Sequence, residues 1–106
     1  MGKQRYALFT NEQGGILDDL MVTRREGDLF VVVNAACKAA DFAHIEARLP
    51  AGVSLLRAPH RALLALQGPK AAEVLARHAP EIASLAFMSA TETKIAGLTC
   101  HVSRSG

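Results

Sequence analysis

The stretch Leu29-Phe30-Val31-Val32-Val33-Asn34 is the strongest strand in the sequence, and the rest of the fold is worked out from it. Its β-branched and aromatic side chains favour an extended backbone. Two more strands are expected before it, over residues 6–10 and 16–23, with turns at residues 11–15 and 24–28. Glycine suits both turns because it adopts positive φ at little cost. Three consecutive strands with short connections predict an antiparallel meander.

Beyond Asn34 the apolar residues recur at the period of a helix rather than that of a strand. This pattern predicts a helix over residues 37–49, which Pro50 then ends. The remaining elements are expected to be two strands, a second helix and a closing hairpin, over residues 53–58, 62–67, 70–78, 91–95 and 98–103. Strands and helices do not alternate one for one, so the fold class is α+β, with antiparallel strands and two helices. The order is strand, helix, strand, helix, hairpin, in one domain over residues 1–106.

Composition narrows the function classes without choosing one. The chain has 106 residues, of which 50% are hydrophobic and 21% charged, as is ordinary for a globular domain. A net charge of only +2 argues against nucleic-acid binding, and no apolar run is long enough to span a membrane. The two cysteines favour a reducing compartment, and the four scattered histidines show no metal-ligand spacing. We therefore expect no nucleic-acid partner, no membrane association and no metal.

The adjacent carboxylates Asp18 and Asp19 lie on an expected strand, so their side chains point to opposite faces. At least one of them should face the interior, where a carboxylate needs a partner or a function. From the pattern alone, a structural carboxylate that bonds loop amides or a basic neighbour is favoured over an acid/base group. Asn34, at the end of its strand, suits either a cap of the following turn or a ligand contact, and the pattern favours the cap.

Four segments together resemble the glycine cleavage system T protein family of aminomethyltransferases. Two of these segments in combination are specific to that family: Gly-Gly-Ile-Leu-Asp-Asp-Leu, which starts at Gly14, and Leu-Gln-Gly-Pro, which starts at Leu66. The resemblance runs from about Tyr6 to Gly106. The four segments, in order and spacing, are residues 8–23, 29–37, 62–69 and 102–106.

The resemblance implies part of a folate-binding domain of the T-protein type. The implied reaction transfers a one-carbon unit from the aminomethyl-lipoyl arm of the H protein to tetrahydrofolate and releases ammonia. It makes Asp19 the catalytic carboxylate beside the folate nitrogens. It also places Val32 and Asn34 along the pterin pocket and Tyr6 against the folate. For Asp18 the structural interpretation stands.

The family's chain is several times longer and continues beyond the position of Gly106 into Tyr-Thr-Gly-Glu, whose glutamate anchors the pterin. We therefore expect this fragment to be inactive alone and to bind tetrahydrofolate weakly or undetectably. Unpaired strand edges predict a homodimer. The resemblance implies a location in the bacterial cytoplasm or the mitochondrial matrix.

Three alternatives share the scaffold. The chain resembles the folate-binding region of dimethylglycine-oxidising or sarcosine-oxidising enzymes, which flanking sequence with a flavin-binding fingerprint would favour. It also resembles folate-dependent demethylases, which only a substrate assay separates. The last alternative is a non-catalytic folate-binding module.

Overall fold

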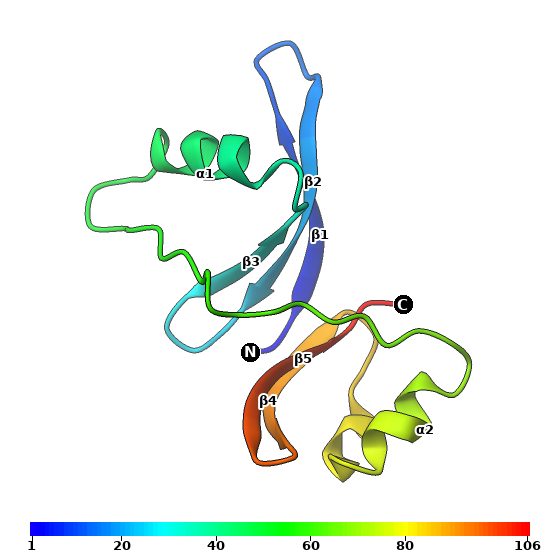
Figure 1. Cartoon of the computed structure of the whole chain (residues 1–106). Coiled ribbons are helices and arrows are strands. Elements are labelled where there is room, and N and C mark those ends of the chain that lie inside the picture. Colours follow the sequence, from blue (N-terminus) through cyan, green and yellow to red (C-terminus); the bar gives the residue numbers. More distant parts are fainter. The chain divides into compact units, whose positions relative to one another are not determined.

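The structure is a computed structural model, and it describes all residues 1–106. It is α+β, as predicted, with one three-stranded sheet, one two-stranded sheet and two α-helices (Figure 1). The elements in chain order are β1 (Gln4–Thr10), β2 (Ile16–Arg24), β3 (Leu29–Val33), α1 (Lys38–Glu46), α2 (Ala71–Ala76), the 3₁₀ helix η1 (Pro80–Ser84), β4 (Ser89–Ile95) and β5 (Leu98–Arg104).

The meander predicted for the first three strands is confirmed, because the sheet order is β1-β2-β3. The turn between β1 and β2 is built on Asn11, whose Oδ1 accepts the backbone N–H groups of Gln13 at 3.1 Å and Gly15 at 2.7 Å. Gly14 has a φ of +79° there, a conformation that other residues adopt at a cost. The central position of β2 places its side chains between those of the two outer strands.

The closing hairpin is also confirmed. Strands β4 and β5 pair antiparallel from Ser89 opposite Arg104 to Ile95 opposite Leu98. The two residues between them, Ala96 and Gly97, have φ angles of +51° and +81°. Two consecutive positive φ values are the geometry of the tight turn that matches the twist of a hairpin.

Both predicted helices form, in shorter versions. Helix α1 follows the N-cap residue Cys37, and helix α2 follows Lys70. The second helix ends at Ala76, and Pro80 begins a short 3₁₀ helix that the sequence pattern did not predict. Neither α-helix is long or apolar enough to cross a membrane.

The two strands predicted over residues 53–58 and 62–67 are wrong, because this segment is irregular. Most of its large apolar side chains face solvent; Leu56 is 88% exposed and Leu64 is 90% exposed. The prediction rested on apolar runs and β propensity, which describe how well a residue suits a sheet. A strand also needs a neighbour that accepts and donates backbone hydrogen bonds, and no strand of this chain pairs with the segment.

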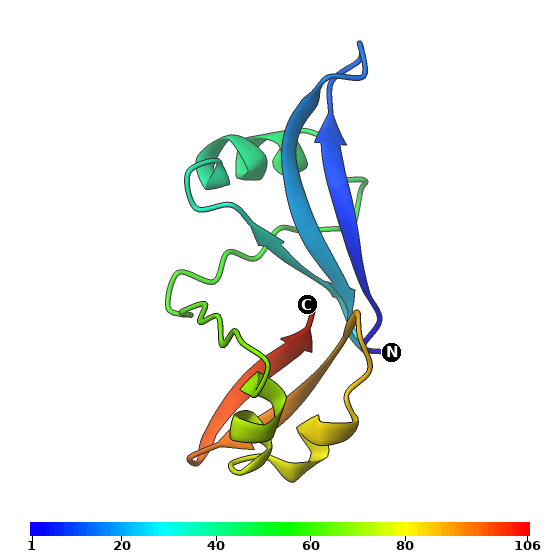
Figure 2. The same cartoon turned by 90° about the vertical axis from the view of Figure 1, so that its right-hand side faces the viewer.

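The chain divides into two compact units, and each strand of the three-stranded sheet contributes residues to both. The first unit comprises Met1–Arg5, Val22–Phe30 and Leu64–Gly106, and the second comprises Tyr6–Met21 and Val31–Leu63. Buried apolar residues of the first unit include Ala79, Ile82 and Ala90. In the second unit, α1 lies beside β2 in both views (Figures 1 and 2). Leu20 is its buried apolar residue, and the carboxyl groups of Asp18 and Asp41 are buried as well.

The tight turn of the closing hairpin provides a stability test. Gly97→Ala should lower the free energy of unfolding by about 1 kcal/mol, because the added Cβ disfavours the left-handed conformation. Gly27→Ala, in the same unit, is the matched control: Gly27 has no positive φ, and a Cβ there meets no atom within 4 Å. Urea unfolding followed by circular dichroism measures both. Equal midpoints for the two variants would contradict the assignment of strain to the Gly97 turn.

Candidate functional site

The carboxylate of Asp19 is held by side chains from both neighbouring segments of the sheet. Tyr6, on β1, donates its hydroxyl to Asp19 Oδ2 at 2.7 Å. Asn34, directly after β3, donates its side-chain N–H to Asp19 Oδ1 at 2.7 Å. Because Asp19 lies on the central strand, the meander brings together three residues that are widely separated along the chain. All three belong to the second unit.

Val32, the fourth residue singled out from the sequence, lies in β3 and is half-buried. Its side chain is apolar, so it takes no part in the hydrogen bonds around Asp19. Tyr6 is 60% exposed. The structure thus connects Tyr6, Asp19 and Asn34 by hydrogen bonds, whereas Val32 lies two residues before Asn34 and is not part of these hydrogen bonds.

The second carboxylate, Asp18, binds the same asparagine. Asp18 is only 8% exposed, and its Oδ1 accepts the Asn34 side-chain N–H at 3.0 Å. Its Oδ2 accepts the backbone N–H of Asn34 at 3.4 Å, a long contact. The hydrogen bond from Asn34 is the main reason why the pKa of Asp18 lies below its ordinary value. The two consecutive carboxylates of β2 thus accept from the same amide nitrogen, and Asn34 lies just past the last residue of β3.

The side chain of Asn34 does not cap α1. The N-cap of that helix is Cys37, which makes no side-chain capping bond. The backbone carbonyl of Asn34 accepts the Cys37 N–H at 3.1 Å, which closes the turn between β3 and the helix. Its side-chain amide therefore donates its hydrogen bonds to the two aspartates and not to the helix.

Sequence reasoning missed two members of the cluster, Asp41 and Cys37. Asp41, on α1, is 3% exposed. Burial is the main cause that raises the pKa of Asp41, and it is also the main cause that raises the pKa of the Cys37 thiol. The signal was present in the helical spacing: Cys37, Asp41 and Ile45 recur every four residues, which places one carboxyl in a stripe of otherwise weakly polar residues.

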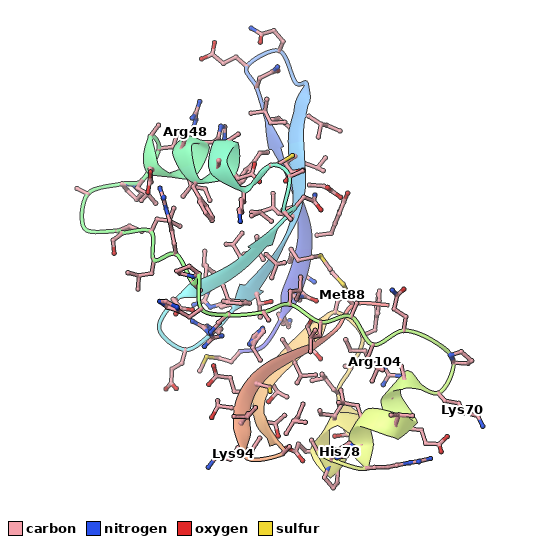
Figure 3. All side chains as sticks on the ribbon, viewed as in Figure 1. Arg48, Lys70, His78, Met88, Lys94 and Arg104 are labelled. Atoms are coloured by element: carbon pink, nitrogen blue, oxygen red, sulfur yellow. The ribbon has the colours of Figure 1, made fainter.

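The partners that hold Asp18 and Asp19 in hydrogen bonds are neutral, an amide and a phenol. Arg48, labelled at the end of α1 in Figure 3, instead donates to the backbone carbonyl of His44 at 3.2 Å. The negative charge of Asp19 is therefore oriented by its hydrogen-bonding partners without being neutralised by them. Such a carboxylate can accept a further N–H and stabilise a nearby positive charge.

The phenol of Tyr6 is a direct reporter of this arrangement, because Tyr6 is the chain's one tyrosine. Its hydrogen bond to Asp19, with smaller contributions from burial and from the two aspartate charges, raises its pKa above the ordinary 10.0. Absorbance at the tyrosinate band should show this raised pKa, and Asp19→Asn should bring it back toward 10.0. The associated stability is present below pH 10.0 and is lost as the pH rises through the folded-state pKa.

Glu12→Gln removes a charge from the exposed β1–β2 turn and should leave the Tyr6 titration unchanged. A titration at or below 10.0 in the unsubstituted chain, with far-UV circular dichroism showing a folded protein, would refute the Tyr6–Asp19 contact.

Comparison with known proteins gives these residues a context. Residues 1–106 match the model of the GCVT N-terminal domain family. The chain is 43% identical to the human mitochondrial aminomethyltransferase over 94% of its own length and 27% of that protein. Identities are 40% to the mitochondrial aminomethyltransferase of Pisum sativum and 35% to that of Dictyostelium discoideum, each over 99% of this chain and 28% of the relative. No solved structure matches the chain.

This chain therefore spans about a quarter of the length of these relatives. The family model, in contrast, covers every residue from Met1 to Gly106. The chain belongs to the GCVT N-terminal domain family.

Proposed function

We propose that this chain is part of an aminomethyltransferase, the T protein of the glycine cleavage system. The reaction transfers a one-carbon unit from the aminomethyl-lipoyl arm of the H protein to tetrahydrofolate and releases ammonia. Aminomethyltransferase is the name of the relatives compared above, which supports the assignment of the reaction. The observation that carries the proposal is the Asp19 carboxylate, oriented by Tyr6 and Asn34 and not neutralised by either.

Tetrahydrofolate would supply the nitrogen that receives the one-carbon unit. A carboxylate suits that chemistry because positive charge develops near the nitrogen and a proton must leave as the new bond forms. Each oxygen of Asp19 accepts one hydrogen bond from the protein and has lone-pair capacity for another. Asp19 can therefore accept an N–H from a ligand while Tyr6 and Asn34 keep it in place.

The remaining predicted residues fit a pteridine in chemical character. Tyr6 offers an exposed aromatic ring, Val32 an apolar side chain, and Asn34 an amide oxygen that accepts hydrogen bonds. A flat heterocycle edged with N–H groups and acceptors needs this mixture of apolar contact and paired polar atoms. We propose Asp19, Asn34, Val32 and Tyr6 as the folate-binding residues, with Asp19 also acting in catalysis.

The names of the relatives favour aminomethyl transfer over the oxidising-enzyme, demethylase and non-catalytic alternatives. All three relatives described above are named mitochondrial, so the expectation of a cytoplasmic location gains no support from them. We propose the mitochondrial matrix for a eukaryotic source, with the lipoylated H protein as the protein partner.

Replacing the matching segment of the human aminomethyltransferase with this chain tests the function. We expect the chimera to be active with H protein and tetrahydrofolate, and Asp19→Asn to lower its turnover about 100-fold, because the shape is kept and the charge is lost. Glu12→Gln is the matched control and should leave turnover unchanged. Near-normal turnover of Asp19→Asn would remove Asp19 from the mechanism, and a folded but inactive chimera would count against the proposed reaction.

We also propose that the chain by itself forms a homodimer through unpaired strand edges. The sheet order leaves β1 and β3 as outer strands, and such edges present backbone groups that seek a partner strand. Light scattering should give a mass near twice 11.3 kDa at high concentration, falling toward the monomer on dilution. A clean monomer across the whole range would contradict the dimer.

A further inference from the structure

The two asparagines of the chain use opposite ends of their side-chain amides. Asn11 uses its oxygen, which accepts two backbone N–H groups in the β1–β2 turn. Asn34 uses its nitrogen, which donates to Asp18 Oδ1 at 3.0 Å, Asp19 Oδ1 at 2.7 Å and the Asp19 backbone oxygen at 3.1 Å. A half-turn of the Asn34 amide would bring its oxygen against these three oxygen atoms, which have no hydrogen to share. The orientation of this amide is therefore fixed, and its hydrogen bonds leave the lone pairs of Asn34 Oδ1 unused.

The neighbours of Asn34 in the site have no hydrogen left to donate either. The hydroxyl hydrogen of Tyr6 goes to Asp19 Oδ2 at 2.7 Å. An ionised carboxylate has no hydrogen of its own, so Asp19 can only accept. Tyr6 and Asn34 are exposed and Asp19 is half-buried, so a ligand can reach all three residues. The polar atoms that they offer to a ligand are therefore all hydrogen-bond acceptors.

We propose that Asn34 is a specificity-determining residue: its fixed oxygen, together with the Asp19 carboxylate, selects a ligand that presents N–H groups and disfavours one that presents acceptor nitrogens. The acceptor-only character of the site rests on the hydrogen bonds of this chain alone. Its application to folates rests on the proposed function.

Folates differ in this property according to their oxidation state. Two ring nitrogens of the pteridine carry hydrogen in tetrahydrofolate, whereas in folate the same two nitrogens carry none and present lone pairs. An acceptor that meets an N–H forms a hydrogen bond, but an acceptor that meets a lone pair leaves both polar atoms unpaired. Sites that pair with a ligand's N–H discriminate strongly against an analogue without it. The site should therefore select the reduced pteridine over the oxidised one.

Hydrogen exchange of the two asparagine side chains tests the fixed orientation without a ligand. In the ¹⁵N-labelled 106-residue chain, the side-chain N–H groups of Asn34 should exchange with solvent about tenfold more slowly than those of Asn11. Asn11 is the matched control because its side-chain hydrogen bonds are made by its oxygen. Equal exchange rates in the folded chain would overturn the fixed orientation and the proposal with it.

Calorimetric titration of the chimera described above with tetrahydrofolate and with folate tests the preference itself. We expect tetrahydrofolate to bind about 100-fold more tightly. Because the two ring systems also differ in shape, the decisive measurement is how this ratio changes in variants. Asp19→Asn supplies an N–H that can pair with an acceptor nitrogen, so the ratio should fall about tenfold. Asn34→Ala removes the fixed acceptor and should also lower the ratio, whereas Glu12→Gln should leave it unchanged.

The outcomes separate this proposal from the proposed function. Equal affinity for the two folates, or a ratio that neither Asp19→Asn nor Asn34→Ala changes, would overturn the selection of N–H groups. If the ratio changes as expected while Asp19→Asn keeps full turnover, the selection survives and the proposed catalytic role fails. A folded chimera that binds neither folate contradicts both proposals. A chimera that fails to fold leaves the exchange rates of Asn34 and Asn11 to decide.

Discussion

The side-chain amide of Asn34 connects the two aspartates of the candidate functional site. The Asn34 side-chain nitrogen donates to the carboxylates of two consecutive residues of β2, to Asp18 Oδ1 at 3.0 Å and to Asp19 Oδ1 at 2.7 Å. Asn34 is a neutral donor and the two aspartates are negative acceptors. The hydrogen bonds therefore fix the orientation of the carboxylates without neutralising their charge.

The hydrogen bonds from Asn34 to the two aspartates depend on the three-stranded meander. Strand β2 carries the two aspartates, β1 supplies Tyr6, and the end of β3 supplies Asn34. The turn from Asn34 to Cys37 then starts α1, which carries the buried Asp41. Residues 6–41 thus form a continuous chain segment in which local elements, in sequence order, assemble the whole polar cluster.

Outside that segment the sequence pattern was less reliable, for identifiable reasons. The closing hairpin was predicted well because its turn residues, Ala96 and Gly97, specify a local geometry. Residues 53–58 and 62–67 were predicted as two strands from composition and are irregular, since no strand of this chain supplies their hydrogen bonds. The 3₁₀ helix that begins at Pro80 was missed, because a proline indicates where one helix stops more clearly than whether another begins.

The sequence by itself determined the local elements: the three strands, the turns between them and the first helix. Each of these depends on the period of apolar residues or on turn chemistry within a few positions. Only the tertiary structure decided that both aspartates bind the amide of Asn34, and that Asp41 on α1 is buried. The physical reason is that the charge and hydrogen bonding of a buried carboxyl depend on which groups folding brings against it.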